Sequence, residues 1–216
     1  MRRFRVTAHM NSPIIFGGGY ATLDGLLGAL LFDQLDDVDA AHAAIPLANT
    51  DGLFHASAAF YEPVEVGKTT FVASLRAQHD LDADLLRKNK TGTATHRAIS
   101  TKRERDFGNV FNTYRRVTTP KIDWYAEGDQ AAVLRLLQDA RFIGKRRASG
   151  FGEVERWTIE EDELDGITGH LDEPLRPVPV ELFKGDQSAI KADAAWRPAY
   201  WNPAHRAICF VPGDGQ

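Results

Sequence analysis

Long apolar runs and paired cysteines are the two features that this sequence lacks. No stretch of eighteen consecutive apolar residues occurs, which excludes a transmembrane helix. Cys209 is the single cysteine, so no disulfide can form within the chain. We therefore expect a reducing, cytoplasmic environment, with Cys209 as a small core residue rather than a nucleophile. Arg2, Arg3 and Arg5 lead into alternating sequence rather than the apolar stretch of a signal peptide.

Motifs for metals and nucleotides are also missing. The seven histidines are scattered without the spacing of metal ligands. Residues Val66–Thr70 are similar to the end of a phosphate-binding loop, but Glu62 stands where that motif requires glycine. The aspartates between Asp33 and Asp39 follow a helical pattern in alanine-rich sequence, which indicates a solvated turn. We expect no cofactor and no metal.

The net charge of −4 conceals an uneven distribution of charge. The segment from Leu85 to Lys121 carries ten basic residues against Glu104 and Asp106, a local charge of +8. A second basic cluster, Arg141 to Arg147, contains four cations and no acid. Positive charge concentrated in two stretches of an acidic protein is typical of a protein that binds a polyanion. The alternative interpretation of these stretches is a solvated basic loop.

Hydrophobic periodicity predicts an α+β fold. Phe4–Met10 alternates as a half-buried strand, and the leucines from Leu23 to Leu35 have helical spacing after a cap at Thr22. Further along the chain we expect strands at Leu53–Tyr61, Thr69–Arg76, Lys121–Glu127 and Glu153–Glu160, and a second helix after Asp129.

The order of these elements, with one additional strand, is that of the ferredoxin-like, RNA-recognition-motif-like pattern. We expect one such domain over residues 1–165, with a basic insertion at about residues 80–120. The proline-rich remainder, residues 166–216, is expected to be an irregular extension packed on the same core, with one short strand at Ala207–Val211.

The loop from Phe142 to Gly152 combines glycines with cations. Glycine permits positive φ and close approach of the backbone to a ligand, successive N–H groups can form an anion site, and the cations attract phosphate. The loop's candidate RNA-binding residues are Gly144, Lys145, Arg146, Arg147, Ser149, Gly150, Phe151 and Gly152. Phe151 either stacks on a base or fills the core of a tight turn, and the sequence leaves both alternatives open.

Two blocks, Thr119–Asp129 and Phe142–Gly152, resemble the RAMP superfamily of CRISPR proteins, whose hallmark is a ferredoxin-like fold with a glycine-rich loop before the last strand. Together with Leu23–Leu27 and Arg197–Trp201, they resemble the type IV subunit that binds the 5′ handle of the guide RNA. The resemblance implies a prokaryotic cytoplasmic protein that binds crRNA, contacts backbone and large or helicase subunits, and meets target nucleic acid indirectly.

The basic insertion occupies the position where such subunits carry a thumb-like insertion. We therefore predict RNA contacts from its cations: Lys88, Lys90, Arg97, Lys102, Arg103, Arg105, Arg115 and Arg116.

Two other functions remain open from the sequence. RAMP relatives that cut the guide precursor can use a histidine, and His9 and His55 are the residues that we consider as a general base of a metal-independent endoribonuclease. A structural scaffold that holds an acidic protein is the other possibility. A lone histidine with no placed partner is more often structural, so we expect no catalytic residue.

Overall fold

The computed structural model describes residues 2–73 and 110–213, which form two compact units, residues 67–115 and the remainder of the chain. The helices are α1 (Leu23–Leu35), α2 (Val38–Ala43) and α3 (Gln130–Gln138), with short 3₁₀ turns at Arg147–Ser149 and Pro203–His205. The strands are β1 (Arg2–Met10), β2 (Asn49–Thr50), β3 (Leu53–Phe54), β4 (Glu65–Ala73), β5 (Val110–Thr118), β6 (Lys121–Gly128), β7 (Val154–Glu161), β8 (Val178–Pro179), β9 (Lys191–Ala195) and β10 (Arg206–Phe210).

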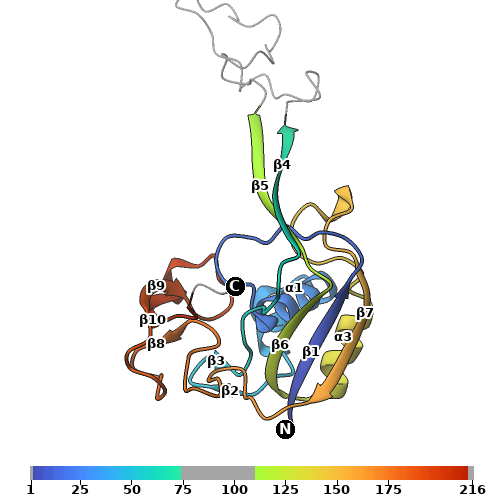
Figure 1. Ribbon diagram of the computed structural model, residues 1–216. Coiled ribbons are helices and arrows are strands. Elements are labelled where there is room, and N and C mark those ends of the chain that lie inside the picture. Colours follow the sequence, from blue (N-terminus) through green and yellow to red (C-terminus); the bar gives the residue numbers. More distant parts are fainter. Residues whose placement is uncertain (1, 74–109, 214–216) are drawn as a thin grey trace, which may run out of the picture. The chain divides into compact units, whose positions relative to one another are not determined.

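An antiparallel sheet of order β6-β1-β7 forms the centre of the larger unit (Figure 1). Phe4, Val6 and Ala8 of β1 are fully buried and lie opposite Ala126, Trp124 and Ile122 of β6, which are buried as well. The alternation in the sequence therefore places apolar side chains on one face of the sheet. The predicted strands around Phe4–Met10, Lys121–Glu127 and Glu153–Glu160 are confirmed as β1, β6 and β7.

The predicted strand Leu53–Tyr61 is mostly wrong as a continuous element. Only Leu53–Phe54 forms a strand, β3, which pairs with β2. Its continuation runs antiparallel to the free edge of β6 through isolated bridges from Ala56 to Ala126 and from Phe60 to Asp123. The ladder is interrupted because intervening groups bind elsewhere: the Ser57 carbonyl accepts from Leu23, and Ala58 donates its N–H to Leu175.

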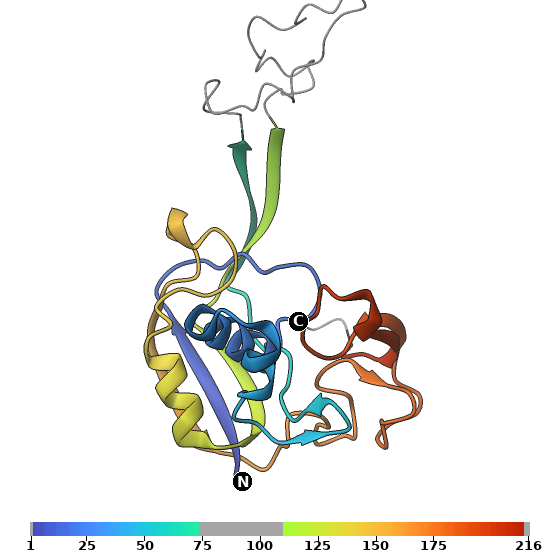
Figure 2. The ribbon, with the colours of Figure 1, turned by 180° about the vertical axis from the view of Figure 1, so that it is seen from behind.

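The helices cover the apolar face of the sheet, as the view from behind shows (Figure 2). Leu23, Leu27 and Leu31 of α1 are buried, and Val133 and Leu137 are the corresponding residues of α3. The Thr22 side chain accepts from the N–H of Gly25, as predicted for a helix cap. The short helix α2, capped by Asp37, was not predicted; it forms where the sequence suggested only a solvated turn.

The C-terminal extension is more regular than expected. A second sheet of order β8-β10-β9 forms there, and β10 corresponds to the predicted strand at Ala207–Val211. Its core contains Val178, Phe183 and Phe210. Cys209 is buried, and this burial raises the pKa of its thiol to about 11, in agreement with a core role.

In the unit of residues 67–115, Thr70 and Thr113 share a hydrogen bond, and the rings of Phe71 and Tyr114 pack edge to face. These contacts join β4 to β5. The predicted strand Thr69–Arg76 corresponds to β4, which begins four residues earlier.

Within residues 2–73 and 110–213, no helix has both the length and the apolar character needed to cross a membrane.

Candidate nucleic-acid interface

The loop from Phe142 to Gly152 connects α3 to β7 and is fixed at both ends by the backbone. Phe142 pairs with Glu153, and the N–H of Ile143 donates to the Gly152 carbonyl at 2.8 Å. Two further bonds attach the loop to a neighbouring segment, Pro13–Ile15. The N–H of Lys145 donates to the Ile15 carbonyl and that of Gly152 to the Pro13 carbonyl, each at 2.8 Å. The position of the loop is therefore set by hydrogen bonds within the protein.

Three glycines of the loop have positive φ, for two different reasons. At Gly144 a Cβ would lie 2.7 Å from the Ile15 carbonyl oxygen, and at Gly152 it would overlap the Ile143 carbonyl oxygen. These two glycines allow the chain to approach itself. Gly150, at φ +83°, has open space around the Cβ position, so only its backbone conformation requires glycine. Close approach to a ligand is thus a possible role for Gly150 alone.

Five backbone N–H groups of this loop, including that of Ile143, donate within the protein. Lys145 and Gly152 donate to Pro13–Ile15, while the N–H groups of Ser149 and Gly150 donate to Arg146 and Arg147 in the 3₁₀ turn. An anion-binding concavity of successive N–H groups, one of the possibilities that the sequence raised, could not use these five donors. The exposed side chains of the loop are the other groups that could contact an anion.

Lys145 and Arg147 are both exposed, and neither forms an ion pair with another described residue. Arg146 is half-buried and adopts the left-handed conformation, with φ 60°. By contrast, Arg141, just before the loop, binds Glu153 at 2.9 Å. The Arg141 hydrogen bond lowers the pKa of the Glu153 carboxyl, with a smaller contribution from Asn11. The charge of Arg141 is therefore compensated.

The two exposed cations have different surroundings. The Lys145 side chain passes Gly17, and its Cε lies 3.7 Å from the Cβ position of that glycine. A cavity of about 270 Å³ lies on this side, bounded by residues 16–22, the start of the loop and α1. Arg147 instead lines a shallow depression whose lining includes Asp33 and Asp139. Carboxylates so placed oppose the approach of phosphate to Arg147 more than to Lys145.

Segment Pro13–Ile15 also connects the loop to the end of β5. Ile14 and Val117 exchange backbone hydrogen bonds at 2.8 and 2.9 Å. Segment Pro13–Ile15 therefore pairs with the glycine loop along one edge, through Pro13 and Ile15, and with Val117, the neighbour of Arg116, along the other. Arg116, however, binds Glu65 at 2.6 Å and is partly neutralised by it. Arg115 is exposed.

Of the remaining predicted site residues, Ser149 is exposed and Phe151 is half-buried. Six predicted residues lie outside the described part of the chain: Lys88, Lys90, Arg97, Lys102, Arg103 and Arg105.

The outer face of the central sheet is a second basic region, but its cations are paired. Arg3 binds Glu127 at 3.2 Å and Arg5 binds Glu160 at 2.6 Å. The hydrogen bond that Arg5 donates to Glu160 outweighs burial and raises the pKa of the Arg5 guanidinium. Lys121, at the end of β6, lies 3.1 Å from Asp123. Little uncompensated positive charge remains on these side chains.

His9 and His55 lie near opposite ends of the sheet. His9 pairs with Lys121 in the β1–β6 register; its Nδ1 accepts from Arg156 and its Nε2 contacts the Thr158 hydroxyl, each at 3.2 Å. Because a guanidinium can only donate, this hydrogen bond requires Nδ1 to be the acceptor. His55, 3.8 Å from Glu127 at the other end, shares a 2.9 Å hydrogen bond with Thr50. Each ring is held by neighbouring side chains. No group of three metal-ligating side chains occurs among the described residues.

A buried ionic network joins α1 to the C-terminal extension, and sequence analysis missed it. Arg176 and Asp24 are both fully buried, 3.2 Å apart. The Arg176 guanidinium also donates to the carbonyls of Phe54, Ala56 and Trp196, at 2.7 to 2.9 Å.

Tyr200 completes this network: its hydroxyl donates to Asp24 at 2.7 Å and accepts from Arg176 and Thr22. Although burial lowers the pKa of Arg176, the charge of Asp24 raises it above its ordinary value. Burial also raises the pKa of the Tyr200 phenol well above its usual range. Asp24, in the first turn of α1, is therefore a structural ion-pair partner. The only hint in the sequence was an arginine between prolines in an apolar run, Pro174–Val180.

Comparison with known families defines the class of this protein. A family model described as CRISPR type IV associated protein Csf3 matches residues 60–212, which identifies a CRISPR-associated protein of type IV. The match covers well over half of the chain and includes the glycine loop, Arg176 and Tyr200. The chain belongs to the Csf3 family. A comparison with curated proteins finds no match.

Proposed function

We propose that this protein binds guide RNA as a non-catalytic subunit of a type IV CRISPR effector complex. In this proposal it holds the 5′ handle of the crRNA and contacts the backbone subunit and the large or helicase subunits. Membership of the Csf3 family supports the association with such a complex. The observation that carries RNA binding is Lys145: an exposed cation without an ion-pair partner among the described residues, on a loop that the backbone holds in place.

The order of the strands supports a ferredoxin-like, RAMP-type domain. With the segment Ala56–Phe60 on the free edge of β6, the order is β7, β1, β6 and then this segment, all antiparallel to their neighbours. Two helices, α1 and α3, pack on one face. This is the arrangement expected when two βαβ halves interleave. In this arrangement, the basic insertion between β4 and β5 corresponds to the proposed thumb.

The cavity beside Lys145 supports a contact with a base in addition to phosphate. Its wall includes Phe16, which stacks on Tyr61 with ring centroids 5.0 Å apart, and three consecutive glycines, Gly17–Gly19. Proteins that read single-stranded RNA combine phosphate contacts with surfaces for unstacked bases. We propose that a base next to the phosphate bound by Lys145 enters this cavity.

The salt dependence of RNA binding tests the proposal directly. Replacing Lys145, Arg146 and Arg147 by alanine should weaken crRNA binding and reduce the log–log salt slope by about 1 to 2, since each phosphate contact with a single strand contributes about 0.7. The unfolding midpoint of the triple variant serves as the folding control. An unchanged slope in the folded variant would exclude the loop from the RNA site.

The alternative function is metal-independent cleavage of the guide precursor. Incubation of the pure protein with repeat RNA in chelator separates the two, and we expect intact RNA. A defined product that disappears with His9→Ala or His55→Ala would establish the endoribonuclease instead. The hydrogen bonds of both rings to side chains of the sheet and its edge support structural roles. Failure to retain RNA at physiological salt would favour the third possibility, a scaffold for an acidic protein.

A further inference from the structure

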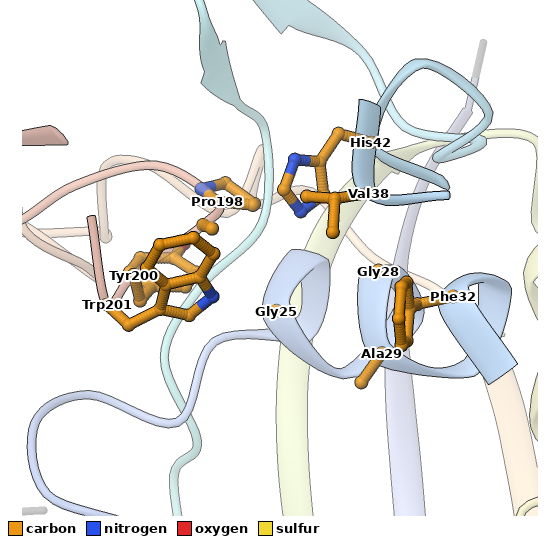
Figure 3. A pocket seen from close by; sticks show the side chains of 10 residues that line it. Gly25, Gly28, Ala29, Phe32, Val38, His42, Pro198, Tyr200 and Trp201 are labelled. Atoms are coloured by element: carbon orange, nitrogen blue, oxygen red, sulfur yellow. The ribbon is translucent and has the colours of Figure 1, made fainter. Parts of the chain in front are cut away.

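A groove of about 470 Å³ lies between α1, α2 and the turn at Pro198–Trp201, distant in the sequence from the glycine loop. Figure 3 shows Phe32 on α1 and Val38 on α2 on one side, with Tyr200 and Trp201 across the opening. The lining is largely apolar. The groove shares Gly25 and Tyr200 with the cavity beside Lys145, but its other lining residues take no part in the RNA contacts proposed above.

The groove exists because one side of α1 carries small residues. Gly25, Gly28 and Ala29 follow at helical spacing and form its floor. A Cβ at Gly25 would lie 3.1 Å from the Tyr200 ring, and one at Gly28 would lie 3.4 Å from the His42 ring. Both walls therefore pack directly on the helix. Since Tyr200 is also held by Asp24 and Arg176, the groove is preformed.

Large apolar side chains stand exposed at its edges. Trp201 has 78% of its surface exposed, Phe32 40% and Val38 39%. Leu35, one helical turn after Phe32, is 47% exposed. Contiguous exposed apolar side chains of this size are typical of sites that bind another macromolecule, and tryptophan is enriched among the residues that dominate binding energy.

Negative charge surrounds this apolar surface. Four aspartates, Asp33, Asp36, Asp37 and Asp39, alternate with Leu35 and Val38 and are all exposed. Asp33 and Asp36 lie at the carboxyl end of α1, where the helix dipole is already negative and where the last turn contains no basic residue. Asp37 caps α2, and Asp39 lies in the first turn of that helix. None of the four forms an ion pair within residues 2–73 and 110–213. Arg147 shares a depression with Asp33, so the charge without a nearby cation is that of Asp36, Asp37 and Asp39.

We propose that the groove binds a segment of a partner protein that inserts one bulky apolar side chain between Trp201 and Phe32. Lysine or arginine next to that side chain in the partner would contact Asp36 and Asp39. Charge complementarity selects this occupant, because the same carboxylates repel the phosphates of a nucleic acid. The other subunits of the type IV complex are the partners to test first, given the family.

The main experiment removes the exposed indole. Each other subunit of the complex, purified separately, is titrated against the full chain, the Trp201→Ala variant and a control, Leu171→Ala, which removes an 85% exposed apolar side chain elsewhere. We expect Trp201→Ala to weaken binding of one subunit by about 30-fold, a typical hot-spot effect, and to leave crRNA affinity unchanged. Leu171→Ala should bind like the unaltered chain. If Trp201→Ala binds every subunit normally, the proposal fails.

A second experiment tests the charge. The pair Asp36→Asn and Asp39→Asn keeps side-chain shape and suits the left-handed conformation of residue 36, which has φ 52°. This pair should weaken binding of the same subunit and reduce the salt dependence of that binding. The control pair Glu155→Gln and Glu181→Gln, both exposed, should leave binding and salt dependence unchanged. Equal effects of the two pairs would refute a specific acidic rim.

The third experiment identifies the occupant. A photo-crosslinking amino acid at position 201 is activated in the assembled complex, and the attached peptide is sequenced. A peptide of another subunit that contains a bulky apolar residue beside lysine or arginine supports the proposal. A crosslink to RNA, to a second copy of this chain or to an acidic segment overturns it, and so does a complex that forms no crosslink at this position.

Discussion

The glycine loop and the outer face of the central sheet are both rich in cations, yet they differ in available charge. Arg3 and Arg5 on the sheet bind Glu127 and Glu160. Lys145 on the loop has no such partner among the described residues. The reason is geometric: strand pairing sets each sheet residue beside residues of two neighbouring strands, whereas the tip of a loop has no neighbouring strand. Charge counted along the sequence therefore overestimates the charge that a phosphate meets.

The largest expected effect concerns Arg176, a cation that is buried as well as paired, unlike those of the loop and the sheet. Arg176→Met should lower the free energy of unfolding by about 3–5 kcal/mol, because it leaves the Asp24 carboxylate buried without its cation. Arg5→Met, which breaks the more exposed pair with Glu160, should cost about 1 kcal/mol or less. Chemical denaturation of both variants measures the difference. Similar losses would mean that burial does not distinguish these ion pairs.

The next effect concerns the shape of the glycine loop. Gly152→Ala should destabilise the protein by about 3 kcal/mol, because the new Cβ overlaps the Ile143 carbonyl and φ is positive. Gly150→Ala has positive φ but open space, so a loss of about 1 kcal/mol is expected. Unfolding midpoints test this order. If Gly150→Ala is the more damaging of the two, the backbone contacts of the loop are not what requires glycine.

The comparison of the two basic regions is tested by a matched pair of substitutions. Lys145→Ala should reduce the log–log salt slope of crRNA binding by about 0.7, and Arg5→Ala should leave it unchanged. Binding isotherms at several salt concentrations give both slopes. An equal reduction by Arg5→Ala would show that the ion pair with Glu160 does not keep Arg5 from the RNA.

The smallest effect distinguishes the two exposed cations of the loop, Lys145 and Arg147. Arg147→Ala should reduce the salt slope less than Lys145→Ala, because Arg147 shares its depression with Asp33 and Asp139. Asp139→Asn should in turn strengthen crRNA binding by roughly 2-fold, since it removes a charge that opposes phosphate. If Asp139→Asn weakens binding, the depression is not part of the approach to the loop.

Much of the central sheet could be predicted because local pattern and tertiary environment agree there. Phe4, Val6 and Ala8 alternate with polar residues, and the same alternation faces the core. The segment Ala56–Phe60 was misjudged because the backbone around Ser57 binds α1 and the C-terminal extension as well as β6. The C-terminal sheet was underestimated, since proline-rich sequence gives weak strand signals, and β8 is only two residues long.

Within the candidate site, the sequence locates the glycine loop but not the contacts that its residues make. The positions of Lys145 and Gly152 follow from the sequence, but the reason for the glycine does not: it allows contact with Ile143, within the protein itself. The partners of the cations also had to come from the structure. Arg116 and Glu65 are far apart along the chain and yet form a 2.6 Å ion pair.

By itself, the sequence determined the periodic strands and helices, the position of the glycine loop and the location of the positive charge, because each depends on residues near one another in the chain. Tertiary structure alone decided which charges are compensated and where a groove opens. Asp24 and Arg176 are 152 positions apart, and only folding brings them into one buried network. The groove at Trp201 likewise requires α1, α2 and the C-terminal turn together. Interactions between distant segments leave no periodic pattern in a single sequence.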